Sequence, residues 1–306
     1  MIDPRSVHID AALSNISVMF KNAAFVAEQI LPVLQVQKES DKFYKYDKQD
    51  AFKLPDTIRA DGTEANEASL AISTDDYAVN EHALKDIVTD RVRDNADVAI
   101  QPDIDITEWL TGLILLRLEK DMATLVTSIT NITNNITLSG TNQWSDYDNS
   151  TPLSDIKTGK ASVRKNTGRE ANTITLGGDV AETLSLHPEI KDLRKRVDAS
   201  LLTDAGLPPK ILGLKVIEAK SVEDQAYAGK TASLGYVFGK NALISFTDPN
   251  AGLRSLTLGR VIRAKARTTR KWRDEGRRGT MIEVSDMFVC KLIAEECGYL
   301  IAASIA

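Results

Sequence analysis

The pattern of apolar and polar positions divides the first third of the chain into segments of different character. Residues 9–31 carry apolar side chains at helical spacing and end at Pro32, which cannot continue a helix. Residues 33–54 and 69–80 are extended in pattern, and the Asp61-Gly62 pair between them indicates a turn. These two arms predict a long hairpin-like loop. The apolar spacing over 84–92 then favours a helix.

A long apolar helix is predicted over residues 105–129. Asp105 followed by Glu108 has the spacing of a capping box and marks the expected start. Apolar side chains lie on more than one face of this segment, and about 25 residues at 1.5 Å each give a helix of roughly 37 Å. The segment therefore predicts a spine on which other elements pack.

The remaining two thirds of the chain mix helical and extended patterns. Interleaving without a regular βαβ rhythm predicts an α+β fold rather than a doubly wound sheet. The expected helices are 153–166, 178–186 and 190–196, and the expected strands are 131–138, 173–176, 210–217, 235–238, 242–246, 256–272 and 280–299.

Composition narrows the function classes. The chain has 306 residues, 42% of them hydrophobic, which is enough for a sizeable core. A net charge of −5 argues against a dedicated nucleic-acid binder. The spacing of Cys290 and Cys297 fits no metal or redox motif, so two reduced thiols are expected. With no secretory pattern and no apolar run of membrane-spanning length, we expect a soluble chain made in a cytoplasm.

Residues 38–100 are much richer in charge than the chain average of 26%, and they contain no apolar run that could form a core. Apolar residues such as Phe43, Ile58 and Leu70 are nevertheless spaced along the segment. A segment that cannot bury such residues on itself is expected to bury them elsewhere. The partner is either the rest of the chain or another copy of it.

A basic cluster near the end of the chain is the sharpest charge feature. In an extended strand, Arg263, Lys265 and Arg267 would share one face. Phosphate-backbone contact is one interpretation. The other is salt bridges to the acidic tract 56–97 of the same or a neighbouring subunit, which the acidic balance of the chain favours. Only Asp274 and Glu275 oppose the nine basic residues, which are Arg260, Arg263, Lys265, Arg267, Arg270, Lys271, Arg273, Arg277 and Arg278.

No catalytic constellation can be assembled from the sequence. Neither a GxSxG nor an HExxH pattern occurs. His187 precedes Pro188 and is interpreted as a helix-entry residue. The Gly177-Gly178 pair is interpreted as a tight strand-to-helix turn, and residues 235–241 are one residue short of a P-loop, with Asn241 in the metal-binding place. We therefore predict no enzyme activity, catalytic residue, cofactor or metal ligand.

The order of these features resembles the major capsid proteins of tailed bacteriophages, which have the HK97-type fold. An N-terminal arm is followed by a long charged loop over 38–100, which resembles the E-loop of the family, and by the spine helix. The strand and turn at 138–146 come next, and then 173–180 and 186–190, which resemble the entry to the axial domain. The segments 267–272, 282–284 and 297–301 resemble the family's ending.

The resemblance implies a domain organisation. It comprises an N-terminal arm (1–37), an E-loop hairpin (38–100), a peripheral domain with the spine helix (101–168), a mixed-sheet axial domain (169–254), and return strands of the peripheral domain with the C-terminus (255–306).

The resemblance also implies a function, which is self-assembly into an icosahedral shell around double-stranded DNA. The implied partners are further copies in hexamers and pentamers, a separate scaffolding protein, a portal, a possible decoration protein and DNA contacted non-specifically, with no membrane. The implied location is the virion, after assembly in the host cytoplasm. An encapsulin-type shell around protein cargo and a hydrolase with an unrecognised site stay as alternatives. The candidate lattice contacts are Lys42, Lys45, Lys48, Arg59, Arg263, Arg267, Arg270 and Arg273.

Overall fold

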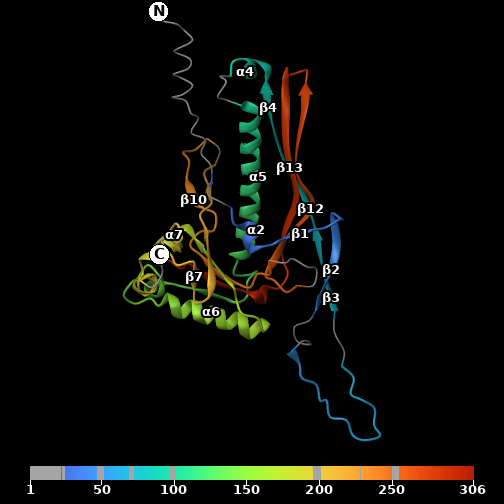
Figure 1. The fold of residues 1–306 in the computed structure, drawn as a ribbon, viewed down its shortest axis with the longest axis vertical. Coiled ribbons are helices and arrows are strands. Elements are labelled where there is room, and N and C mark those ends of the chain that lie inside the picture. Colours follow the sequence, from blue (N-terminus) through green and yellow to red (C-terminus); the bar gives the residue numbers. More distant parts are fainter. Residues whose placement is uncertain are drawn as a thin grey trace, which may run out of the picture.

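The structure is a computed structural model, and it shows an elongated molecule with a helix-backed sheet, a second sheet domain and a projecting hairpin (Figure 1). It describes residues 22, 25–46, 52–68, 72–96, 101–195, 201–227, 229–249 and 255–306. Most of the predicted N-terminal arm, including the apolar pattern over 9–20, lies outside the described residues. In the part of the chain that is described, no helix is long and apolar enough to cross a membrane.

The upper part of the molecule is a four-stranded sheet backed by one long helix, α5 (Pro102–Val126). The strands β12 (Gly259–Asp274) and β13 (Gly279–Leu292) form a long antiparallel hairpin. On its two sides lie β1 (Val33–Gln35), parallel to β12, and β4 (Asn80–Thr89), antiparallel to β13. A short helix, α4 (Asp90–Asp94), follows β4.

The lower part is built on a six-stranded mixed sheet in the order β5-β14-β11-β6-β8-β7. One face packs against α6, α7 and α8, and the other contributes residues to the core beneath α5. The strands are β5 (Asn135–Thr137), β6 (Thr173–Gly177), β7 (Lys210–Ile211), β8 (Leu214–Ala219), β11 (Ala242–Ser245) and β14 (Gly298–Ala302). The helices are α6 (Pro152–Thr167), α7 (Gly178–Leu186) and α8 (Pro188–Arg194), with 3-10 turns η1 (Gly140–Asn142) and η3 (Glu295–Cys297).

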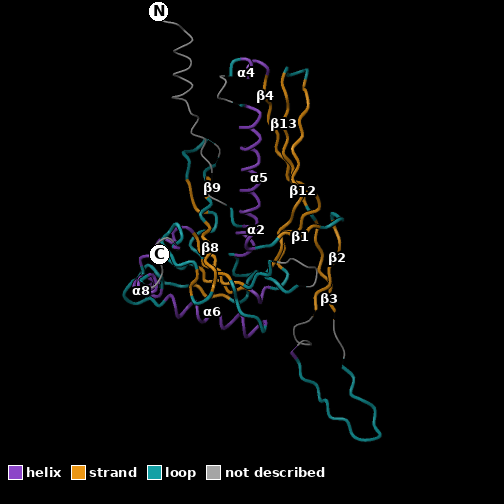
Figure 2. The backbone as a smooth tube through the Cα atoms, viewed as in Figure 1, coloured by secondary structure: helices purple, strands orange, loops and turns teal. Residues whose placement is uncertain are grey.

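Two hairpins project from this body. The strands β9 (Val222–Asp224) and β10 (Leu234–Tyr236) form a small hairpin on the α5 side of the lower sheet. The strands β2 (Ser40–Tyr46) and β3 (Ile72–Ala78) form a second antiparallel pair, beyond which residues 52–68 extend away from the body (Figure 2). We call β2, residues 52–68 and β3 the E-loop hairpin.

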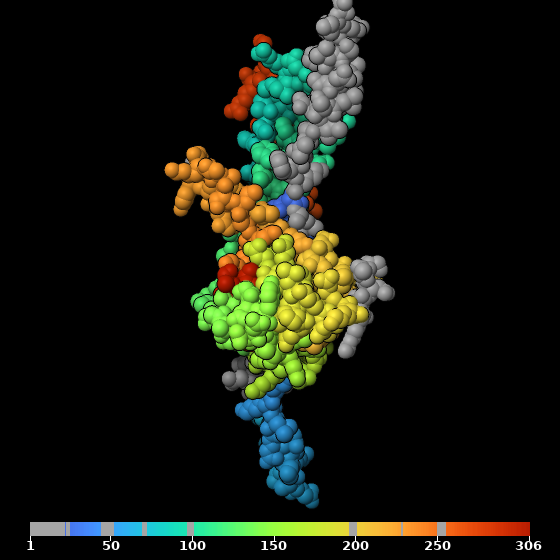
Figure 3. Space-filling view, turned by 90° about the vertical axis from the view of Figure 1, so that its left-hand side faces the viewer, coloured from blue at the N-terminus to red at the C-terminus, as the bar shows by residue number. Residues whose placement is uncertain are grey.

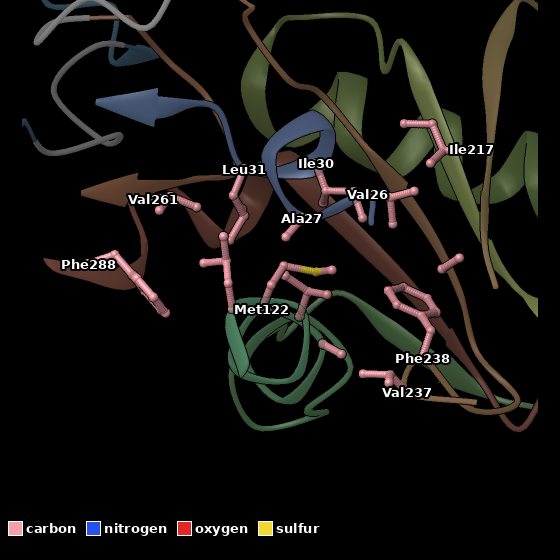
Figure 4. Packing of buried hydrophobic residues seen from close by; sticks show 14 of the residues in the cluster. Val26, Ala27, Ile30, Leu31, Met122, Ile217, Val237, Phe238, Val261 and Phe288 are labelled. Carbon is pink, nitrogen blue, oxygen red and sulfur yellow. The ribbon is translucent and has the colours of Figure 1, made fainter. Parts of the chain in front are cut away.

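A buried carboxylate anchors the start of α2 (Ala27–Ile30) to the middle of the molecule. Glu119 of α5 is 1% exposed, and it accepts hydrogen bonds from the amides of Val26 at 3.0 Å and Ala27 at 2.8 Å. Its other oxygen accepts from Ser221 Oγ at 3.4 Å. Burial is the main influence on Glu119 and raises its pKa, against the lowering effect of these bonds. Around this anchor, residues from α2, α5 and both sheets share one apolar cluster (Figure 4).

The structure confirms the α+β class, the hairpin and the long helix, and corrects three local predictions. The extended run predicted over 280–299 is divided between β13, which ends at Leu292, and β14, which begins at Gly298 in the other sheet. The helix begins at Pro102 rather than Asp105, because proline suits the first helical position; Asp105 lies inside the first turn and no side chain caps the start. Of the segment 84–92 predicted as a helix, residues 84–89 belong to strand β4, since they pair along β13, and only residues 90–92 are helical, in α4. Cys290 and Cys297 are free thiols, and burial raises the pKa of each to about 12.

Candidate intersubunit contact surface

The tip of the E-loop hairpin exposes apolar side chains on a locally ordered backbone. Leu54 is 90% exposed and Ile58 is 83% exposed. Asp56 Oδ1 accepts from the amide of Ile58 at 3.0 Å, and Asn66 Nδ2 donates to the Asp56 carbonyl at 2.9 Å, which joins the two arms. Because these bonds are local, the tip needs no core of its own to keep this shape.

Contacts at the root of the hairpin hold it to the body. Lys291 Nζ of β13 lies 3.1 Å from Asp75 Oδ1 of β3. Lys265 of β12 lies 3.8 Å from Glu39, just before β2. The Phe52 ring lies beside Gly168 at the end of α6, where a Cβ would be 3.6 Å from Phe52 Cε1. The hairpin is thus fixed at its base, and its tip extends from the body (Figures 1 and 3).

The predicted hairpin cations are spread along this element. Lys42 is an exposed residue of β2. Lys45 also lies in β2, but its side chain falls outside the described part, as does the whole of Lys48. Arg59 stabilises the tip itself, because its Nε donates to the carbonyl of Thr63 at 2.6 Å.

The arginines of β12 have partners that the sequence did not indicate. Arg263 Nε lies 3.1 Å from Asp286 Oδ1, and Arg267 Nη2 lies 3.3 Å from Asp286 Oδ2, although we expected acids from 56–97. The Asp286 side chain is fully buried, and Glu28 of α2 also pairs with Arg263 at 3.0 Å. The register of β12 shifts twice between Arg263 and Thr268. These irregularities break the strict alternation expected for Arg263, Lys265 and Arg267.

The far end of β12 does pair with the predicted acidic tract, within one chain. Arg273 binds the Asp90 carboxylate of α4 through two nitrogens, one of them at 2.6 Å. The acidic tract is thus confirmed as a partner for Arg273, while Lys271 pairs with Asp103 at 3.6 Å. Arg270 is exposed and forms no ion pair with any other described residue.

One serine and histidine pair has the outline of a catalytic dyad, but its hydrogen bonds run the wrong way. Ser150 Oγ lies 3.2 Å from His187 Nε2. His187 Nδ1 accepts from the amide of Glu189 at 3.3 Å, so the proton of the neutral ring is on Nε2. Ser150 Oγ in turn donates to the Asp146 carbonyl at 2.6 Å. A base for Ser150 would need a bare Nε2, so this geometry does not activate the serine. The histidine starts α8, as predicted.

The glycine motifs also have structural explanations. A Cβ on Gly177 would lie 2.0 Å from the carbonyl oxygen of Gly239, so the strand-to-helix turn and the β10–β11 turn approach each other directly. Gly239 itself has φ of +62°, a conformation that favours glycine. Among the described residues, no group of three or more His, Cys, Asp or Glu side chains could hold a metal ion.

Comparisons with known proteins agree with the architecture. The chain is 30% identical to the major capsid protein of Pseudomonas phage JBD67, over 81% of this chain and 80% of that one. It is 26% identical to the major capsid protein of Burkholderia phage BcepMu, over 96% of each. No family model matches. The chain belongs to the major capsid proteins of phages.

Solved structures show the same fold at low sequence identity. A phage-related protein from Bordetella bronchiseptica has a TM-score of 0.68 at 19% identity, covering 96% of this chain and 97% of that one. The capsid structure of cyanophage P-SCSP1u has a TM-score of 0.67 at 10% identity, and the match covers 94% of this chain and 90% of that one. The HK97-type fold predicted from the order of segments is thereby confirmed.

Proposed function

We propose that this chain assembles with copies of itself into the icosahedral shell of a phage head that encloses double-stranded DNA. The observation that carries the proposal is the E-loop hairpin tip, where Leu54 and Ile58 are 90% and 83% exposed on an element ordered by local hydrogen bonds. Exposed apolar side chains on a preorganised element are typical of a binding surface, because little conformational entropy is lost on contact. Family membership supplies the partner, which is a neighbouring subunit.

Several finer expectations belong to the same proposal. Hexamers and pentamers form in the host cytoplasm with a separate scaffolding protein and a portal, and a decoration protein is a possible addition to the finished virion. DNA is contacted without sequence preference. Lys42, Lys45, Lys48, Arg59 and Arg270 are proposed as lattice contacts. Arg263, Arg267 and Arg273 are also proposed to contribute to lattice contacts, while they remain paired with Asp286 and Asp90 of their own subunit.

Substitution of Leu54 and Ile58 by serine tests the proposal. Since both side chains are exposed, L54S/I58S should change the free energy of unfolding of the isolated subunit by no more than about 0.5 kcal/mol. It should greatly reduce the fraction eluting as ring-sized or megadalton particles. Ile129 and Leu186 belong to other segments of the chain than the hairpin and are 53% and 52% exposed, so I129S/L186S is the control. A wild-type chain that stays monomeric at high concentration would contradict the proposal.

The contents of the particles decide between a phage head and a protein-packaging shell. Particles made during infection should contain nuclease-protected double-stranded DNA and show icosahedral outlines in electron micrographs. Particles filled with one protein cargo and no DNA would favour the encapsulin-type alternative instead.

A further inference from the structure

The helix α6 carries a ridge of positive charge on its exposed side. Its buried positions are Pro152, Ile156, Gly159 and Val163, at the spacing of a single helix face. Lys157, Arg164 and Lys165 are exposed and Lys160 is half-buried, at positions i, i+3, i+7 and i+8. We call Lys157, Lys160, Arg164 and Lys165 the α6 ridge.

No acid within the segment balances this ridge. Residues 156–169 contain five basic residues and no acidic one, in a chain of net charge −5, so the rest of the chain carries −10. Glu170 is the one described acid that pairs with the ridge, at 3.5 Å from Lys160 and 3.1 Å from Arg164. Asp155, the acid just before this segment, accepts a hydrogen bond from the indole of the buried Trp144 at 2.9 Å, so its carboxylate is directed to the interior and not to the ridge.

Like charges three and four residues apart destabilise a helix. Lys157 with Lys160, and Lys160 with Arg164, both have this spacing. Part of the ridge is used within the subunit, because Arg164 and Lys165 lie in the last turn of α6, where positive charge suits the helix dipole, and Arg164 pairs with Glu170. Lys157 and Lys165, by contrast, are exposed and form no ion pair with another described residue, so their charge is open to a partner.

The position of α6 indicates which partner. Figure 1 looks down the shortest axis of the molecule, so its plane contains the two long dimensions. In that plane α6 lies along the lower margin of the body, beneath the six-stranded sheet. Lys157, Arg164 and Lys165 are exposed and lie outside the buried stripe of α6, so they face solvent along this margin. Lys160 lies on the flank of that stripe and donates to the Leu212 carbonyl at 3.1 Å. Subunits of a closed shell meet at their margins, whereas their broad faces are directed inward and outward.

We propose that the α6 ridge is an intersubunit surface that binds an acidic surface of a second copy of this chain. The proposal rests on the proposed shell function. The second copy offers suitable charge, because Asp56, Asp61, Glu64 and Glu67 are exposed and none forms an ion pair with another described residue. A contact between two different surfaces is heterologous, which is the arrangement that closes rings of subunits.

Neutralising the ridge separates an assembly role from a folding role. The variant K157Q/R164Q/K165Q removes three positive charges from it. The control K210Q/K215Q/K230Q also removes three charges, from exposed lysines outside α6. The isolated ridge variant should unfold at nearly the same temperature as wild type, because the Arg164–Glu170 pair that it loses is exposed and contributes little. Its assembled fraction should fall about tenfold, while the control assembles like wild type.

Salt dependence gives a second measurement. Wild-type assembly should weaken as ionic strength rises from about 0.05 M to about 0.5 M, and the ridge variant should show a smaller dependence, since screening acts on charge pairs at the surface. Equal assembly of the ridge variant and the control would overturn the inference and leave the shell function intact. Normal ridge-variant shells that lose packaged DNA would also overturn it, and would assign the ridge to DNA.

Discussion

Glu119 and Asp286 are buried carboxylates that join segments far apart in the chain. Glu119 accepts from the first amides of α2 and from Ser221. Asp286 holds Arg263 and Arg267, and Arg263 also pairs with Glu28 of α2. Each costs desolvation, so each contributes only while its partners remain in place. Together they fix α2, from which the chain continues into β1 and the E-loop hairpin.

The Glu119 anchor predicts a pH dependence of stability. Burial raises the folded pKa of Glu119 above its unfolded value, so the unfolded state loses this proton first as pH rises. The free energy of unfolding should therefore fall as pH rises from the unfolded pKa through the folded one. In E119Q, which cannot ionise, this pH dependence of the free energy of unfolding should disappear. In E119A, loss of the acceptor for Val26 and Ala27 should cost about 1–3 kcal/mol. Urea unfolding of isolated subunits at several pH values measures both, and an unchanged slope in E119Q would contradict the assignment.

Asp286 should be among the most sensitive positions of β13. The substitution D286A leaves Arg263 and Arg267 without their buried partner, and we expect a loss of about 3–5 kcal/mol in the free energy of unfolding. Lys265 lies between these arginines, but its side chain is 70% exposed. K265A is therefore the matched control and should change stability by less than about 1 kcal/mol. Equal losses in the two variants would refute this difference.

The candidate charges could be found from sequence, but their partners could not. The run from Arg260 to Arg278 is visible by composition, whereas the choice of Asp286 depends on the β12–β13 register and its two shifts. The burial of Arg260 could not be predicted from the sequence either, since it is 2% exposed and donates to Ser255 instead of lying on the surface. The α6 ridge was within reach, because its charge spacing is present in the segment predicted as a helix.

The helices α5 and α6 use glycine in opposite ways. In α6, a Cβ on Gly159 would lie 2.6 Å from both Ile244 Cδ1 and Tyr299 Cδ1, so glycine permits close packing on the sheet. In α5, a Cβ on Gly112 would meet nothing within 4 Å. The helix α5 also exposes Trp109 by 50% on its outer side. Its outer surface near Gly112 is thus open in the single subunit.

These two glycines form a matched pair for substitution. G159A should destabilise the isolated subunit by about 1–3 kcal/mol, because the new methyl group overlaps Ile244 and Tyr299. G112A should stabilise it by about 0.4–1 kcal/mol, since alanine favours the helix and meets no neighbour. Thermal unfolding of both variants measures the difference, and two effects of the same sign would contradict the packing described.

Elements with strong local signals were predictable, and those determined by distant pairing were not. The long helix and the strand-to-helix turn at Gly177 follow from local pattern. By contrast, Leu84, Ile87 and Val88 have helical spacing, yet they form a strand because β13, almost 200 residues later, pairs with them. The start of α5 was misplaced because a capping pattern at Asp105 outweighed the proline at 102.

On the scale of the whole molecule, the E-loop hairpin is the element that lacks a core of its own. All described residues between 52 and 68 are exposed, while the body contains two apolar clusters. A shell of such subunits would cover this hairpin through neighbours. Local hydrogen bonds give the tip its shape in the isolated subunit, and contact with neighbours should shield its amides from solvent in the shell.

Amide hydrogen exchange can test this difference. In isolated subunits, residues 54–68 should exchange much faster than the amides of β12 and β13, because they lack buried backbone hydrogen bonds. In assembled particles the same residues should become protected. Strong protection in the isolated subunit would contradict the assignment of this segment to intersubunit contact.

The place of β14 in its sheet has a consequence for synthesis. This strand lies between β5 and β11, and its Tyr299 meets α6 at Gly159, yet it is translated after every other strand of that sheet. A ribosome that stops before residue 298 therefore releases a chain whose lower sheet is split in two and whose α6 has lost part of its support. Such a chain would lack the margin that a neighbour needs, so only chains read through to β14 would enter the shell.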